Sequence, residues 1–154
     1  MPDSRHLEWN RRIAMLGLRL LIGTVSLLLG YHKIFVLGLD DQFKWFVRLE
    51  QWFPVWLLVT VNYYAAYVEL IAGCLVFIGL LRDVALYLIL SVLVIVTIGH
   101  SLEEAVWDMH QLVFRTLMLV PLLVLPASWD VFRLDMCFRA TRELAGLRTA
   151  SSAA

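Results

Sequence analysis

Three charged side chains lie deep inside long apolar stretches of this sequence. Glu69 lies near the middle of one stretch, and Arg115 and Arg19 each lie about three residues from the middle of another. A charge at such depth in a bilayer costs at least ~2.5–3.5 kcal/mol on insertion scales, so it is usually paired or functional. Helical side chains lean towards the helix N-terminus, and this direction predicts that Glu69 pairs with Arg115, with Arg19 as the second choice. A structural ion pair without a catalytic part is the alternative.

A second set of ionisable side chains gathers at the expected outer ends of these stretches. Its members are Tyr31, His32, Lys33, His100, Glu103, Glu104, Asp108 and His110. Histidine at a membrane surface can transfer protons, hydrogen-bond a quinone carbonyl or ligate haem. His32 and His100 could face each other as haem ligands, but ordinary interfacial histidines are far commoner than axial ligands. We therefore favour a polar mouth above Glu69, which admits a quinone head group or a proton, over a haem site; solvated helix ends remain the plain explanation of these residues.

The sequence shows no motif of a metal, nucleophile or phosphate-binding site. Zinc-ligand spacing, a nucleophile triad and a glycine-rich phosphate loop are all absent, so we expect no metal site. The two cysteines, Cys74 and Cys137, are far apart in the sequence, and we interpret them as inert thiols. Lys and Arg (13) balance Asp and Glu (13), so the net charge indicates no nucleic-acid partner.

The elements that position the charged residues are expected to be membrane-spanning helices. Of the 154 residues, 61% are hydrophobic, with a mean hydropathy of +0.77, whereas a soluble domain is roughly half apolar. A spanning helix needs roughly 20 apolar residues. The sequence therefore predicts an all-α integral membrane four-helix bundle, formed as a single membrane domain, with spans at about 13–36, 55–81, 84–101 and 111–126 and a tail over 128–154.

Two connecting segments carry further patterns. Polar residues recur at helical spacing over 40–54 (Asp41, Lys44, Arg48 and Gln51), and so do Phe46, Leu49 and Phe53 on another face. This pattern predicts an amphipathic helix in the outer interface, with an aromatic-rich anchoring loop as the alternative. A similar helix is expected over 128–144, with Asp135, Arg139 and Arg142 outward. Only Arg82 and Asp83 separate the second and third spans, which predicts a tight hairpin.

The distribution of Lys and Arg predicts the orientation. The N-terminus, the second turn and the tail carry eight of them: Arg5, Arg11, Arg12, Arg82, Arg133, Arg139, Arg142 and Arg148. The opposite side carries Lys33, Lys44 and Arg48. Because cytoplasmic loops are enriched in Lys and Arg, we expect both termini in the cytoplasm.

Polar and small residues form a stripe along each span. The first stripe is Arg19, Gly23, Ser26, Gly30 and Lys33, the second is Asn62, Ala66, Glu69 and Gly73, the third is Leu93, Thr97 and His100, and the fourth is Gln111, Arg115 and Met118. Lipid disfavours such faces, so they should turn towards one another. Plain helix packing is a sufficient explanation for the Gly and Ser members.

Two of these stripes resemble a known family. Arg19-Leu-Leu-Ile-Gly23, followed by Gly30-Tyr31-His32-Lys33-Ile34-Phe35, is similar to the first-span signature of the DoxX-like membrane proteins. Glu69-Leu-Ile-Ala-Gly73, continuing to Gly79-Leu-Leu-Arg82, is similar to the second-span signature, and His100 fits the end of the third span. The resemblance covers about 12–126.

The resemblance implies a four-helix bundle in a bacterial or archaeal inner membrane. The best-known members of this family are small membrane subunits of thiosulfate:quinone oxidoreductase, and others act as membrane partners of redox proteins. Arg19, Lys33, Glu69, Arg82 and His100 are the positions that match the family pattern. The long aromatic segment over 40–54 departs from that pattern.

These observations together predict a redox-linked, quinone-interacting subunit of a membrane oxidoreductase, with other membrane or periplasmic redox subunits as partners. The expected catalytic residues are Glu69 and His100, which would handle protons, and Arg115. The expected residues binding quinone or an anionic substrate are Arg19, His32 and Lys33. The sequence does not identify the cofactor; quinone is the candidate, and haem is disfavoured. A non-catalytic scaffold or assembly subunit is the alternative, and a small proton or solute carrier is the third interpretation.

Overall fold

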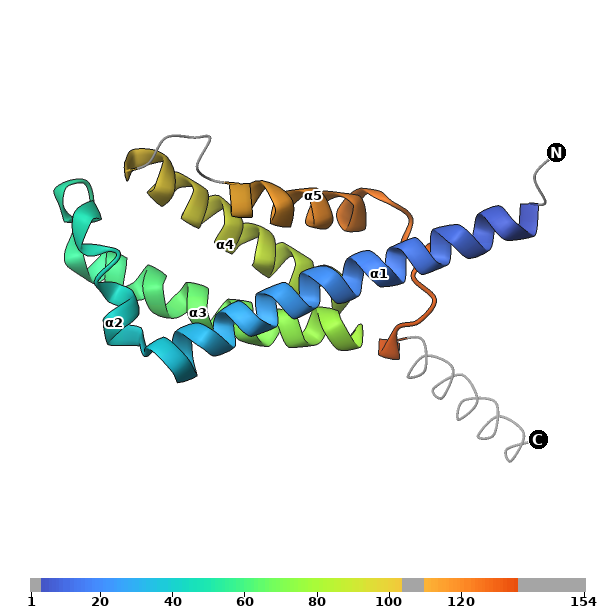
Figure 1. The fold of residues 1–154 in the computed structure, drawn as a ribbon, viewed down its shortest axis with the longest axis horizontal. Helices are drawn as coiled ribbons and strands as arrows, with labels where there is room; N and C mark the ends of the chain where they lie inside the picture. Colours follow the sequence, from blue (N-terminus) through green and yellow to red (C-terminus); the bar gives the residue numbers. More distant parts are fainter. Residues whose placement is uncertain (1–3, 104–109, 136–154) are drawn as a thin grey trace, which may run out of the picture.

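The protein is a bundle of four main helices that run alternately up and down (Figure 1). The computed structural model describes residues 4–103 and 110–135, and nearly all of that part is helical. The main helices are α1 (Ser4–Tyr31), α3 (Val55–Ile78), α4 (Arg82–Glu103) and α5 (His110–Val124). Short helices connect them or follow them: the π-helix η1 (His32–Leu37), α2 (Leu39–Phe43), and the 3-10 helices η2 (Val47–Gln51) and η4 (Ala127–Trp129). The all-α bundle is confirmed.

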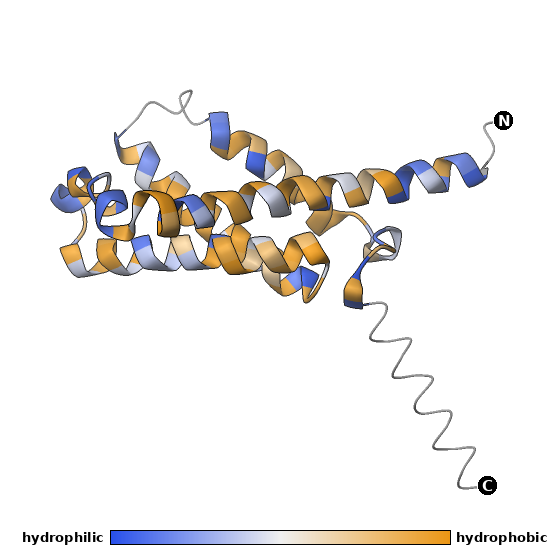
Figure 2. Cartoon of the chain, turned by 60° about the horizontal axis from the view of Figure 1, so that its bottom comes forward, coloured by the Kyte–Doolittle hydropathy of each residue, from blue (hydrophilic) through white to orange (hydrophobic). Residues whose placement is uncertain are grey.

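The helices have the length and composition of membrane spans. Three apolar helical stretches are long enough to cross a bilayer, Arg5–Leu37, Val55–Ile78 and Arg82–Glu103, while α5 is a shorter apolar helix of 15 residues. Figure 2 shows hydrophobic residues along the middle of the bundle and hydrophilic ones at the start of α1 and between α1 and α3. The chain is therefore a multi-pass membrane protein whose outer surface contacts lipid.

Helix α1 packs most extensively against α3, and glycines set the spacing. A Cβ atom added at Gly23 would lie 2.8 Å from the backbone nitrogen of Phe77, and one at Gly30 or Gly73 would overlap the backbone of the facing helix. All three glycines belong to the predicted stripes of α1 and α3. Small residues allow helix backbones to approach closely in a membrane, so these two stripes do face each other.

The change Gly73→Ala is expected to destabilise the bundle by about 1–3 kcal/mol, because the added methyl would press on the α1 backbone beside Leu27. The matched control is Gly17→Ala, where nothing lies within 4 Å of the added Cβ. Thermal unfolding in detergent measures both changes. A Gly73→Ala protein that melts as high as the Gly17→Ala protein would show that the close approach is not required.

The predicted hairpin between the second and third spans is confirmed, although its turn comes earlier than expected. Helix α3 ends at Ile78, and Gly79 adopts a left-handed conformation with φ +75°. The Leu80 amide donates to the Leu75 carbonyl at 2.9 Å, as in a Schellman motif. Arg82 therefore begins α4 rather than forming the turn.

The segment over 38–54, called the lid here, is helical but is not the one continuous helix that the pattern predicts. It is divided into α2 and η2, with turn residues between them. The division allows Leu49 to become buried, near Gly99 of α4, while Asn62 of α3 donates to the Leu39 carbonyl at 3.0 Å. The amphipathic character persists, because Arg48 is exposed.

The helix expected over 128–144 does not begin at 128 in the part that the structure describes. The 3-10 turn η4 is followed at 130–133 by residues without regular secondary structure, helical residues appear only at 134–135, and Asp130 is 1% exposed. Arg11 lies over the Trp129 ring at 4.7 Å, and Phe132 makes an edge contact with Trp9. Contacts with α1 therefore hold this segment against the bundle. The remainder of the predicted helix, with Arg139 and Arg142, lies outside the described residues.

Candidate functional site

The residue at the centre of the candidate site is Glu69, whose side chain is fully buried. Arg115 of α5 donates from Nη2 to Glu69 Oε1 at 2.6 Å, so the predicted ion pair is present. Lys33 donates from Nζ to Glu69 Oε2 at 2.7 Å, a second partner that the sequence did not indicate. We call these three residues the Glu69 cluster; they come from η1, α3 and α5.

The π-helix η1 delivers Lys33 to this cluster. It continues α1 without a break and ends at Gly38, where the backbone has φ +82°. A π-helical turn changes the register of the side chains that follow it, and such turns occur frequently at functional sites. Lys33 retains 19% exposure, whereas Arg115 is 7% exposed, so the lysine is the member of the cluster that reaches open space.

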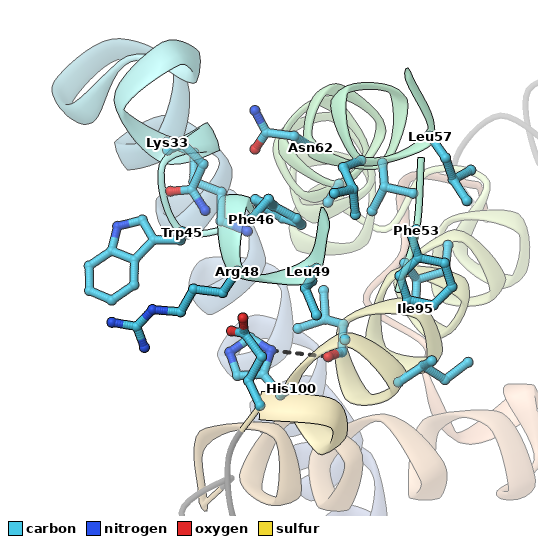
Figure 3. A pocket seen from close by; sticks show the side chains of 18 residues that line it. Lys33, Trp45, Phe46, Arg48, Leu49, Phe53, Leu57, Asn62, Ile95 and His100 are labelled. Atoms are coloured by element: carbon cyan, nitrogen blue, oxygen red, sulfur yellow. Dashed lines mark hydrogen bonds between the residues drawn. The ribbon is translucent and has the colours of Figure 1, made fainter. Parts of the chain in front are cut away.

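A cavity of about 540 Å³ lies next to the Glu69 cluster, beneath the lid (Figure 3). Lid residues and residues of α3 and α4 form its apolar wall: Trp45, Phe46, Leu49, Phe53, Leu57, Leu58, Val61, Ala65, Ile95, Val96 and Ile98. Lys33, Gln42, Arg48, Asn62, His100 and Glu103 add polar groups. A largely apolar cavity with a few convergent polar groups is the usual form of a small-molecule site.

His100 contributes to the polar side of the cavity. It is exposed, and its Nδ1 lies 3.0 Å from the Val96 carbonyl oxygen, a contact drawn in Figure 3. Arg48 and Glu103 line the cavity as well. Lys33 and His100, two residues of the predicted polar mouth, therefore line the same cavity.

The remaining predicted residues lie elsewhere. His32 is exposed on η1 and does not line the cavity. Glu104 and Asp108 are outside the described residues, and Gln111 at the start of α5 is exposed. Over 4–103 and 110–135, no group of three His, Cys, Asp or Glu side chains is placed to hold a metal ion.

Arg19 belongs to a second buried charge cluster at the other end of the bundle. Its Nη1 donates to Asp130 Oδ1 at 2.9 Å, and Arg82 Nε lies 3.1 Å from Asp130 Oδ2. Arg19 also donates to the Phe132 carbonyl, and Arg82 to the Leu122 carbonyl. We call Arg19, Arg82 and Asp130 the Asp130 cluster. Asp130 was missed because it lies in a segment that the pattern predicts as an amphipathic surface helix.

One comparison with known proteins identifies the family of the chain. A family model described as DoxX matches residues 14–101, more than half of the chain, from α1 into α4. No curated protein and no solved structure matches the chain. The matched region contains four members of the two clusters, Arg19, Lys33, Glu69 and Arg82. The chain therefore belongs to the DoxX family.

Proposed function

We propose that this protein is a quinone-interacting, redox-linked subunit of a membrane oxidoreductase. The observation that carries the proposal is the opening of the Glu69 cluster onto an apolar cavity of about 540 Å³. The cavity is large enough for a ring-sized head group, since small-molecule pockets typically measure about 300–1,000 Å³. Intramembrane ionisable residues that border a cavity are functional candidates by default.

Each member of the site has a distinct proposed role. Lys33 donates a hydrogen bond to a quinone carbonyl, because only one of its three N–H donors is directed at Glu69. Glu69 exchanges protons through Lys33, and Arg115 holds the carboxylate in place. His100 exchanges protons between the cavity and the surface, since it borders both. Arg19 takes a structural role in the Asp130 cluster, and His32 has none in this scheme.

The proposal includes an orientation. Both termini face the cytoplasm of a bacterial or archaeal cell, as the Lys and Arg distribution favours. The cavity then lies towards the outer face, where a periplasmic redox subunit would exchange electrons with the bound quinone. Trp45, 70% exposed, and Trp52, 59% exposed, lie on the lid at this end, as interfacial aromatic residues do.

The change Val61→Phe tests the cavity as the quinone site. The larger ring enters the space that Val61 lines, so the binding of decylubiquinone should weaken by about tenfold or more. Quenching of tryptophan fluorescence measures the affinity. The control is Val94→Phe on α4, which is 51% exposed and does not line the cavity. Equal affinities of the two variants would remove the cavity from the proposal.

A further inference from the structure

The charges around the cavity do not balance. Among the described residues that line it or belong to the Glu69 cluster, Lys33, Arg48 and Arg115 are cations, and Glu69 and Glu103 are carboxylates. His100 is the remaining titratable member. One positive charge is left without an anion. In a low-dielectric interior such a charge is costly unless something pairs with it.

The excess charge is directed at the cavity through Lys33. Arg115 is buried and its Nη2 donates to Glu69, so it presents little charge to open space. Lys33 both contacts Glu69 and lines the cavity, and its hydrogen bond to Glu69 uses one of its three N–H donors. Arg48 and Glu103 are both exposed, so water can solvate them and their opposite charges offset each other. A ligand in the cavity therefore meets the ammonium group of Lys33.

The rest of the cavity suits an apolar ligand body. Phe46, Phe53, Leu57 and Ile95 line it. Ile98, which also lines it, is 53% exposed on a helix long and apolar enough to cross a bilayer. The wall and its edge are thus continuous with the lipid-facing surface, which favours a ligand that arrives from the bilayer.

We propose that the cavity binds a membrane-borne amphiphile whose head group carries one negative charge on oxygen, placed on Lys33. This inference rests on the proposed function in using the same cavity, and it deepens that function by naming the charge of the ligand. A neutral carbonyl would accept a hydrogen bond and leave the positive charge unpaired, whereas an anionic oxygen pairs with it. Two sources share this chemistry: a fatty-acid carboxylate and the ionised hydroxyl of an acidic quinone.

Binding measurements on the full chain, in nanodiscs of phosphatidylcholine, distinguish the two sources. The first pair of probes is palmitate and methyl palmitate. The second pair is a 2-hydroxy-3-alkyl-1,4-naphthoquinone, which is anionic at neutral pH, and its methyl ether. We expect the acid to bind about tenfold tighter than its neutral partner in at least one pair, as a charged hydrogen bond allows. The pair that shows the preference identifies the source.

The change Lys33→Gln should abolish the preference, whereas Lys33→Arg should keep it. Lys33→Gln leaves Glu69 paired with Arg115, a neutral pair, so the variant is expected to fold. The matched control is Lys44→Gln on the lid. Lys44 hydrogen-bonds Asp41 at 2.5 Å, which raises its pKa, so it is fully charged at neutral pH, yet it does not line the cavity. Its loss should leave the preference unchanged.

Equal affinity of acid and neutral partner in both pairs for the wild-type chain would overturn the inference, whether or not the variants fold. A preference that survives Lys33→Gln would overturn it as well. These outcomes are separable from the redox proposal. Neutral quinone binding in the cavity without an acid preference would leave the proposed function standing, and palmitate binding without any quinone binding would leave only this inference.

Discussion

Replacing Glu69 with leucine is expected to reduce the folded yield of the protein severely. Among the described residues, Glu69 is the only carboxylate that lies against both Lys33 and Arg115, at 2.7 and 2.6 Å. Breaking a buried ion pair by removing one partner costs about 3–5 kcal/mol, because the other charge stays buried and unpaired. Total stabilities of folded domains are only about 5–15 kcal/mol. The single change therefore removes a large share of the stability.

A compensating change separates this effect from general damage. In the double variant Glu69→Leu with Arg115→Met, the buried guanidinium is gone as well, and Lys33 still borders the cavity. The double variant should therefore melt higher than Glu69→Leu alone. The control is Glu50→Leu on the exposed surface of η2. Folded yield by size-exclusion chromatography and thermal unfolding in detergent measure all three. If Glu69→Leu matched Glu50→Leu, the cluster would not support the fold.

The pairing of Glu69 with Arg115 could be predicted because both residues lie inside regular spans. Depth follows from position in the span, and side-chain direction follows from the direction of the helix. The same periodicity placed Gly23, Gly30 and Gly73 on the faces that meet. In each case the regular period of an α-helix allowed the position of a side chain to be predicted from the sequence.

Lys33 and Asp130 could not be assigned to their partners, and the reason is local geometry. Lys33 lies in a π-helical turn, where the 3-and-4 spacing of an α-helix no longer gives the direction of a side chain. Asp130 follows a 3-10 turn, in a segment that the sequence pattern predicts as an amphipathic surface helix. A charged residue in such a stretch is usually solvated, so only the fold reveals that two arginines surround it.

The two clusters share one composition, a carboxylate between two cations; α1 supplies Arg19 to one cluster, and η1, which continues α1, supplies Lys33 to the other. Arg19 and Lys33 are fourteen positions apart, roughly 21 Å along a helix. The glycine contacts with α3 lie between them. The cavity borders only the Glu69 cluster. We infer that the two clusters have different roles. The Glu69 cluster faces a ligand, and the Asp130 cluster holds the segment over 127–135 against the opposite end of the bundle.

The change Asp130→Leu tests whether the Asp130 cluster holds the segment over 127–135 against the bundle. Arg19 and Arg82 are each 3% exposed, and both would lose their shared carboxylate, at an expected cost of about 3–5 kcal/mol. The segment over 127–135 would lose its ionic attachment to α1 and α4, so tryptic cleavage after Arg133 should accelerate. The control is Asp83→Asn, since Asp83 also pairs with Arg82 but is 61% exposed, and exposed pairs contribute about 1 kcal/mol or less.

The position of the Asp130 cluster makes the test specific. Because it lies at the end of the bundle away from the cavity, any folded fraction of Asp130→Leu should bind decylubiquinone as the wild type does. Loss of binding in a folded Asp130→Leu protein would mean that the two ends are coupled through α1, contrary to separate roles for the two clusters. Unchanged cleavage and melting relative to Asp83→Asn would mean that the aromatic contacts of Trp129 and Phe132 hold the segment by themselves.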